Sequence, residues 1–346
     1  MKKILSCTTF VLVEACASTV GAQNQQKTTS PSTHDAQAIH AEPAPSAAPR
    51  YASTDLSLFW VPWGMHYTRS AWGASLAYKV PLVKKNGVLW ESTNVTVGVR
   101  DLYGYVNNTF GPFIEITPIA VFKLRVEAAY DYFIYSPFNG GLRVLTPLGH
   151  ERLASGQVER GNTSAVDWSA DAGVNNTDNF GEPVNVGGAR LRVMPTLQGK
   201  LGPIVFQYNF MADFNSYSLP KASYKTVFHD TFTFTLRKLQ DVSQTHELVL
   251  AYSMPVRAPG ELLIGVSGRY NRVFGTGLDQ FSLVGMVFAR LPWKMIRGKA
   301  SPFAAVQAGT LLIDPMWQYA FSWVTVVGAD FNLHRSNAYR IPEDKP

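Results

Sequence analysis

From Trp72 to Leu333 the sequence alternates between apolar and polar residues at every second position. In one clear example, residues 95–100 read VTVGVR. Successive side chains of a β-strand point to opposite faces of a sheet, so this period indicates strands, and a helical spacing fits none of these segments. The alternating segments are 72–80, 95–100, 113–123, 126–134, 190–198, 204–213, 228–237, 247–254, 262–271, 281–290, 302–312 and 319–333. The sequence therefore predicts an all-β protein.

The two faces of these segments differ in a way that selects the architecture. The polar face carries mostly Gly, Ser, Thr, Asn and Gln, and only 16% of all residues are charged, compared with roughly 25% in soluble domains. The apolar face ends in aromatic residues: Trp72, Tyr103, Tyr105, Tyr130, Tyr132, Trp293 and Trp323. Such strands are typical of a lipid-facing barrel wall. We therefore predict a closed antiparallel transmembrane β-barrel of about 12 strands, with roughly 10 to 14 allowed.

The N-terminus has the form of a secretory signal peptide. Lys2 and Lys3 precede an apolar stretch, and Val-Gly-Ala then ends at Ala22, so we expect cleavage after residue 22. Both cysteines, Cys7 and Cys16, lie within residues 1–22, which leaves the mature chain without a thiol. Lipidation of Cys16 is an alternative reading of the same segment.

The C-terminal part contains the sequence Gly328-Ala329-Asp330-Phe331-Asn332-Leu333. This pattern resembles the last-strand assembly signal of bacterial outer-membrane β-barrel proteins, although Val326 departs from it and thirteen residues follow Leu333. The resemblance implies a location in the bacterial outer membrane. It also implies two partners, the outer-membrane lipid and the barrel-assembly machinery, the latter through residues 328–333.

The rest of the chain divides by composition. Residues 23–50 contain no aromatic residue and four prolines, which predicts a disordered periplasmic leader. The barrel is expected over residues 51–333, with a long loop at 136–188 and a tail at 334–346. If the last strand ends in the periplasm, counting the segments back from it places this long loop on the periplasmic side. Such barrels usually have short periplasmic turns and long external loops. The count is therefore expected to be wrong by an odd number, with residues 51–67 or 162–174 as a missed strand.

Charged residues on the polar face are the candidate site residues. The expected lumen-lining residues are Arg100, Glu115, Asp131, Arg190, Arg192, Asp213, Arg237, Arg269 and Arg290. Counting across the Leu201-Gly202 turn puts Arg190 opposite Asp213, and similar counting puts Glu115 beside Asp131. Paired inward carboxylates can perform acid–base chemistry, but we interpret them as part of a mixed-charge network that fills a narrow barrel. The loop at 136–188 is expected to be either an inward-folding constriction or a solvated surface loop.

No catalytic, metal or cofactor site is predicted. His229 is expected to face inward among threonines, and His246 and Ser253 are too far apart on one strand to act as a nucleophile and its base. The seven histidines are scattered, without ligand spacing. The net charge of +6 is diluted over the whole chain and gives no support for nucleic-acid binding.

These features predict an outer-membrane channel or transporter for a small solute, passive and mildly anion-selective because the lumen candidates are mostly basic. Three alternatives stay open. The first is a barrel enzyme that acts on lipid or lipopolysaccharide, with His229 as the residue to test. The second is a structural or assembly barrel with a plugged lumen. The third is a secreted soluble β-sandwich that binds carbohydrate. The oligomeric state is not indicated.

Overall fold

A computed structural model describes residues 52–64, 68–82, 93–104, 107–134, 141–154, 180–230, 235–254, 261–290, 300–313 and 321–336. Its strands are β1 (Ala52–Gly64), β2 (Thr68–Pro81), β3 (Asn94–Gly104), β4 (Asn107–Ile119), β5 (Phe122–Phe133), β6 (Val186–Leu201), β7 (Ile204–Ser218), β8 (Val227–Asp230), β9 (Thr235–Lys238), β10 (Gln240–Met254), β11 (Glu261–Val273), β12 (Leu278–Arg290), β13 (Ala300–Ile313) and β14 (Phe321–Ser336). One short helix, α2 (Pro147–Ala154), lies in the connection between β5 and β6.

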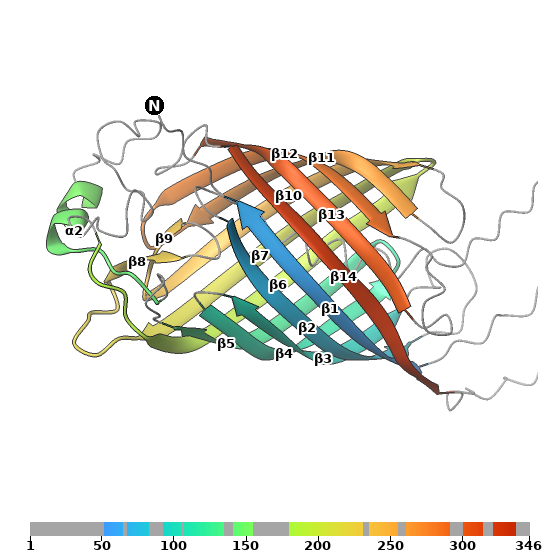
Figure 1. Cartoon of the computed structure of the whole chain (residues 1–346), viewed down its shortest axis with the longest axis horizontal. Helices are drawn as coiled ribbons and strands as arrows, with labels where there is room; N and C mark the ends of the chain where they lie inside the picture. The colour runs from blue at the N-terminus through green and yellow to red at the C-terminus, as the bar shows by residue number, and fades with distance from the viewer. Residues whose placement is uncertain are drawn as a thin grey trace, which may run out of the picture.

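Twelve of these strands form one closed antiparallel barrel (Figure 1). Its order is β1-β14-β13-β12-β11-β10-β7-β6-β5-β4-β3-β2, and β8 and β9 form a separate two-stranded sheet. The first and last wall strands close the barrel by pairing from Ala52 opposite Ser336 to Gly64 opposite Trp323. The predicted closed antiparallel barrel is confirmed, and the alternative of a soluble sandwich is wrong because no second wall sheet faces the first within the described residues.

The predicted number of wall strands, twelve, is right, but the predicted set of segments that form them is not. Residues 52–64, which we treated as an optional missed strand, form the wall strand β1. Conversely, the segment 228–237, which we counted as a wall strand, forms the hairpin β8–β9 and pairs with no strand of the barrel. The two errors cancel in the total. The second optional strand, at residues 162–174, lies outside the described residues.

Exclusion of the hairpin β8–β9 from the wall resolves the conflict over the long loop, because seven wall strands instead of eight then follow this loop. β1 begins and β14 ends at one end of the barrel, which we call the terminal end. The short turns after β4 and β6 lie at this same end, and the long connection between β5 and β6 lies at the opposite end, which we call the loop end. Helix α2 and the hairpin β8–β9 also lie at the loop end (Figure 1).

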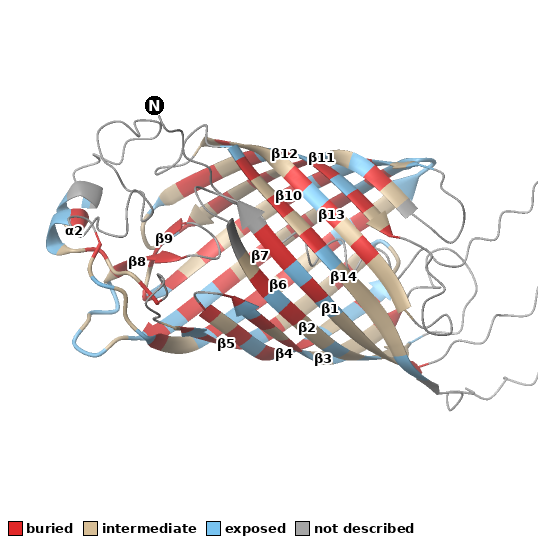
Figure 2. Cartoon of the chain, viewed as in Figure 1, coloured by how far each residue is buried: buried red, intermediate tan, exposed pale blue. Residues whose placement is uncertain are grey.

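The outer wall of the barrel is apolar. Along β10, every second residue from Leu248 to Tyr252 is exposed, whereas the residues between them are buried, and Figure 2 shows the same banding across the wall strands. Aromatic residues stand out at the loop end, where Trp72 is 63% exposed and Tyr130 is 57% exposed. Tyr105 and Trp293 of the predicted aromatic rims lie outside the described residues. A closed barrel pairs its backbone groups internally, so this apolar wall is suited to a lipid bilayer.

Among the described residues, no helix is long and apolar enough to cross a membrane. Residues 1–51 and 337–346, which include the predicted signal peptide and leader, are outside the described residues.

The exposed wall makes a direct prediction about stability in lipid. Leu250 is 45% exposed and lies between Phe206 and Val266 on the neighbouring strands. We expect Leu250→Arg to lower the free energy of unfolding by about 2–4 kcal/mol, because a guanidinium there must enter hydrocarbon. Urea titration of the barrel refolded in phosphatidylcholine vesicles measures this change.

Ser216→Arg is the matched control, since Ser216 is an exposed outer-face residue at the loop end of β7. It should cost only about 0–1 kcal/mol. Equal losses for the two variants would show that the wall around Leu250 does not face lipid.

Candidate functional site in the barrel lumen

Three segments fold into the lumen at the loop end, and we call them together the lumen insert: residues 142–145, residues 180–184 and the hairpin β8–β9. The backbone of Leu142 exchanges two hydrogen bonds with that of Val184, at 2.8 and 2.9 Å. On the other side of residues 142–145, the N–H of Leu145 donates to the carbonyl of Val227 at 2.8 Å. Backbone hydrogen bonds thus connect the three segments of the insert to one another. Part of the predicted 136–188 loop therefore folds inward; residues 155–179 are outside the described residues.

Arg190 is the centre of a buried charge cluster where the insert meets the barrel wall. It projects inward from β6 and is 1% exposed. Its Nε lies 2.8 Å from Asp131 Oδ2, on β5, and 3.7 Å from Asp213 Oδ1, on β7. It also donates to the Tyr217 hydroxyl, which in turn donates to Asp131 at 2.5 Å. Three wall strands thus hold this guanidinium group inside the lumen.

The hairpin contributes two further members of the cluster. Asp230, at the end of β8, places Oδ2 3.2 Å from Arg190 Nη2 and 3.4 Å from Arg237 Nη1. Arg237, on β9, donates to both the carboxylate and the backbone carbonyl of Asp213, at 3.0 and 3.2 Å. Ion pairs therefore connect the hairpin to β6 and β7, strands with which its own strands form no ladder.

The base of the hairpin is connected to the turn between β11 and β12 through Asp241. The carboxylate of Asp241 accepts hydrogen bonds from the backbone N–H groups of Lys238, Val242 and Gly275, at 2.7–2.8 Å. The Thr276 hydroxyl donates to the carbonyl of Leu236 at 2.9 Å. The position of the hairpin is therefore set from two sides of the barrel.

A second charged group lies next to this cluster, towards the terminal end. Glu127 is 2% exposed and is approached by three arginines. The distances from its carboxylate oxygens are 3.1 Å to Arg125, 3.3 Å to Arg192 and 3.6 Å to Arg100. Arg192 also lies 3.9 Å from Asp213 and so connects the two groups. Three guanidinium groups sharing one carboxylate make this part of the lumen basic.

The other expected lumen residues also face inward, at other positions. Lys123 approaches Glu115 at 3.8 Å near the turn between β4 and β5. Arg269 is opposite Glu247 in the β10–β11 register and is 4% exposed. Arg290 pairs with Asp330 near the terminal end. The structure therefore brings Arg100, Asp131, Arg190, Arg192, Asp213 and Arg237 together and leaves Glu115, Arg269 and Arg290 apart from them.

Two of the expected cross-strand neighbours are wrong. Asp213 lies opposite Arg192, and Arg190 lies opposite Asn215, because the β6–β7 turn falls at Gly202-Pro203, with Leu201 opposite Ile204. The long side chain of Arg190 still reaches Asp213 diagonally.

The second wrong pair is Glu115 with Asp131. Glu115 is opposite Arg125, and Asp131 is opposite Thr109, because the β4–β5 turn falls at residues 120–121, with Ile119 opposite Phe122, and not around Lys123. The two carboxylates are thus separated along the barrel.

His229 and His246 lie in different parts of the barrel. His229 is 3% exposed within the lumen insert, with its ring 6.2 Å from that of Phe180, so it does not face lipid. His246 lies on the outer face of β10, and its Nδ1 is 2.7 Å from the Tyr208 hydroxyl. Within the described residues, no group of three or more His, Cys, Asp or Glu residues could hold a metal ion.

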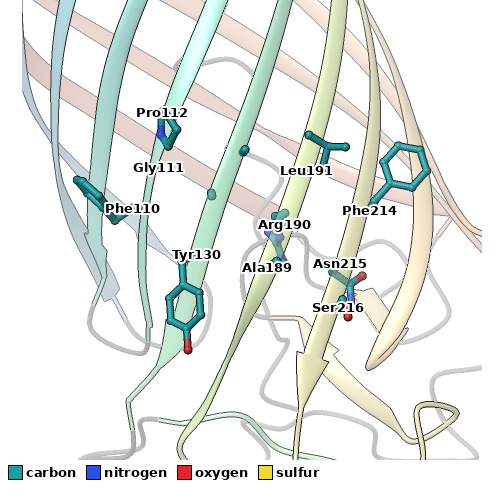
Figure 3. A pocket seen from close by; sticks show the side chains of 12 residues that line it. Phe110, Gly111, Pro112, Tyr130, Ala189, Arg190, Leu191, Phe214, Asn215 and Ser216 are labelled. Carbon is teal, nitrogen blue, oxygen red and sulfur yellow. The ribbon is translucent and has the colours of Figure 1, made fainter.

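A shallow groove of about 520 Å³ lies on the wall over β4–β7 (Figure 3). Phe110, Tyr130, Leu191 and Phe214 project around small residues such as Gly111. A Cβ on Gly111 would lie 2.1 Å from the carbonyl oxygen of Ala128, so close approach of the strands requires glycine there. The projecting rings and Leu191 belong to the exposed outer face, so the groove lies against lipid and is separate from the charged lumen.

Comparison with protein-family models finds no matching family, and comparison with curated proteins finds no relative. Solved structures include similar barrels. The β-domain of the Bordetella autotransporter BrkA is 8% identical, with a TM-score of 0.40 over 81% of this chain and 98% of that chain. The translocator domain of the autotransporter NalP from Neisseria meningitidis is 10% identical, with a TM-score of 0.35 over 82% and 88%. An outer membrane channel from Pseudomonas putida F1 is 11% identical, with a TM-score of 0.38 over 84% and 99%.

The likeness to these proteins is one of overall architecture. Independently of it, the closed antiparallel wall with an apolar outer face and inward charges is the construction of bacterial outer-membrane β-barrels. The predicted location, the bacterial outer membrane, is therefore the location of this chain.

The charge cluster predicts how firmly the hairpin is held. Asp230→Asn removes the carboxylate that Arg190 and Arg237 share. Loss of one partner of a buried ion pair costs about 3–5 kcal/mol, so we expect the hairpin to open more often. His229→Cys provides the reporter, because both native cysteines precede residue 17 and a thiol at 229 is then unique in the cleaved chain. In detergent micelles, maleimide labelling of this thiol should accelerate at least about tenfold, which corresponds to roughly 1.4 kcal/mol.

Asp330→Asn, in the same His229→Cys background, is the control, because Asp330 pairs with Arg290 near the terminal end, whereas the hairpin lies at the loop end. Labelling that is equally slow with and without Asp230→Asn would mean that the ion pairs do not hold the hairpin in place.

Proposed function

We propose that this chain is an outer-membrane channel for small solutes, closed at the loop end by a movable hairpin and mildly selective for anions. The observation that carries the proposal is the way in which the hairpin is held. β8 and β9 form no strand ladder with the wall, and β8 bonds to residues 143–145. Their contacts with the wall strands β6 and β7 combine the buried ion pairs of Asp230 and Arg237 with the packing of Phe228 on Tyr217.

Buried ion pairs support a movable closure better than a permanent one. Replacing a buried ion pair by apolar residues of similar size is often neutral or stabilising. A permanent plug would therefore be at least as stable with an apolar contact at this place. Charged contacts can be exchanged for water when the hairpin leaves the wall, and they favour a single position when it returns.

The basic group around Glu127 supports the anion preference. Arg100, Arg125 and Arg192 share this one carboxylate, so an anion that enters from the terminal end meets an excess of guanidinium groups. Rings of arginine or lysine side chains favour anions in membrane pores. We orient the terminal end towards the periplasm, as in barrels with long outer loops and short periplasmic turns.

One alternative function has a specific observation in its favour. Apolar side chains of the insert pack tightly on the wall: Phe228 and Phe133 are each 0% exposed, and their ring centroids are 6.2 Å apart. This packing is also what a permanently plugged structural or assembly barrel requires. The enzyme alternative has less support, because His229 is enclosed by the insert.

Planar-bilayer recording separates the channel from the plugged barrel. We expect the full chain to show chloride-selective openings with long closed periods. A variant in which Gly-Gly replaces residues 227–238 should conduct at least about threefold more, since the lumen constriction is removed. The replacement is short because the chain ends that it joins are adjacent: the N–H of Leu239 donates to the carbonyl of Thr226 at 3.0 Å.

Asp279→Asn, which leaves the ion pairs of Asp230 and Arg237 intact, should retain the conductance of the unmodified chain. Absence of conductance in both the full chain and the shortened variant would overturn the channel and favour the plugged barrel. Clear cation selectivity would overturn the anion preference.

A further inference from the structure

The inner surface of the barrel is divided lengthwise into two chemically different sides. Strands β3–β7 carry most of the inward charges, including those of Arg100, Glu127 and Arg192. In the strands β12–β14, most of the buried residues that face inward are instead apolar: Met286, Phe288, Phe303, Ala305, Val324 and Val326. Ser282, Gln307 and Ser322 are polar residues among them. In the circular order of the twelve strands, β12, β13 and β14 stand six places from β4, β5 and β6, so the two sides face each other across the lumen.

The apolar side is built from closely fitted aromatic rings. The rings of Phe288 and Phe303 stack with their centroids 6.5 Å apart. A Cβ on Gly328 would lie 2.6 Å from Cζ of Phe303, and a Cβ on Gly73 would lie 2.1 Å from Cζ of Phe59. Glycine at these two positions therefore leaves room for rings that project into the lumen.

The two sides meet at β1 and β3. The guanidinium carbon of Arg100 lies 6.0 Å from the centre of the Phe59 ring, within the range of a cation–π contact. Phe59 belongs to the same apolar cluster as Phe288 and Phe303. An apolar surface and a guanidinium group are thus adjacent in one lumen.

We infer that the solutes of this channel are amphipathic organic anions, compounds with an apolar body and one anionic group. This inference rests on the proposed channel function. The apolar body lies along β12–β14, where apolar side chains outnumber polar ones, and the anionic group lies towards Arg100 and Arg192 on the opposite side. Cations are repelled by the same arginines.

Permanently charged probes test the solute class, because they do not cross lipid in a neutral form. We would measure influx of radiolabelled benzenesulfonate, methanesulfonate and benzyltrimethylammonium into proteoliposomes that contain the full chain. Benzenesulfonate should enter at least about tenfold faster than benzyltrimethylammonium, and faster than methanesulfonate although it is the larger ion. A pore that only sieves by size gives the opposite order for the two sulfonates.

Two variants test the separate roles of the charged side and the apolar side of the lumen. Arg100→Gln leaves Glu127 with two arginine partners and should slow both sulfonates by a similar factor. Met286→Gln keeps the side-chain length on the apolar side, and it should slow benzenesulfonate while leaving methanesulfonate unchanged. Arg272→Gln is the matched control because Arg272 is 42% exposed and paired with Asp279. Heat-dependent mobility on SDS gels confirms that each variant is folded.

Chloride conductance of the same preparation distinguishes two kinds of failure. If the preparation conducts chloride but methanesulfonate enters as fast as benzenesulfonate or faster, the proposed solute class is wrong and the proposed channel is retained. The same conclusion follows if benzyltrimethylammonium enters as fast as benzenesulfonate. Absence of both chloride conductance and sulfonate influx overturns the proposed channel and this inference together.

Discussion

The structure depends on one constraint: in lipid, every backbone N–H and C=O group must find a partner within the protein. Pairing of β1 with β14 satisfies it by removing both free edges of the sheet. The hairpin β8–β9 forms no part of this ladder, and its backbone bonds to other partners: β8 to residues 143–145, and β9 to the side chains of Thr276 and Asn215. A segment that lies inside the closed wall thus depends on partners other than the edges of the sheet.

Much of the wall could be predicted from the sequence because its two faces differ in polarity, and the exceptions have a physical cause. In β1, Phe59 and Val61 face the apolar side of the lumen while Trp60 faces outward, so both faces are apolar and the alternation disappears. In the hairpin, Phe228 and Asp230 share one face and His229 lies on the other. The sequence of the hairpin therefore alternates as that of a wall strand does, although both of its faces are buried. Alternation indicates that the two faces of a strand lie in different environments, but it does not identify either environment as lipid.

The inward direction of the charged residues on the wall strands was also predictable, but their grouping was not, and Arg237 lies on the hairpin instead of the wall. Sequence alternation assigns a side chain to a face, whereas contacts across strands depend on register, which a shift of the turn changes by whole residues. Arg190 and Asp213 meet because the arginine side chain is long enough to span a diagonal. Asp230 was not among the predicted site residues, since nothing in a local segment shows that a hairpin returns to contact a strand 40 residues earlier in the chain.

The charge cluster and the apolar packing of the insert act on different properties of the closed state. Apolar contacts such as Phe228 with Phe133 have no preferred direction and stabilise many arrangements of similar burial. The contacts of Arg190 and Arg237 with three aspartates are directional, and an incorrect register would leave a buried charge without a partner. Apolar burial thus favours an occupied lumen, and the ion pairs select one position of the hairpin within it. When such a hairpin leaves the wall, water can form hydrogen bonds with the charged groups that the ion pairs release. When the hairpin returns, the same directional ion pairs bring it back to the same position.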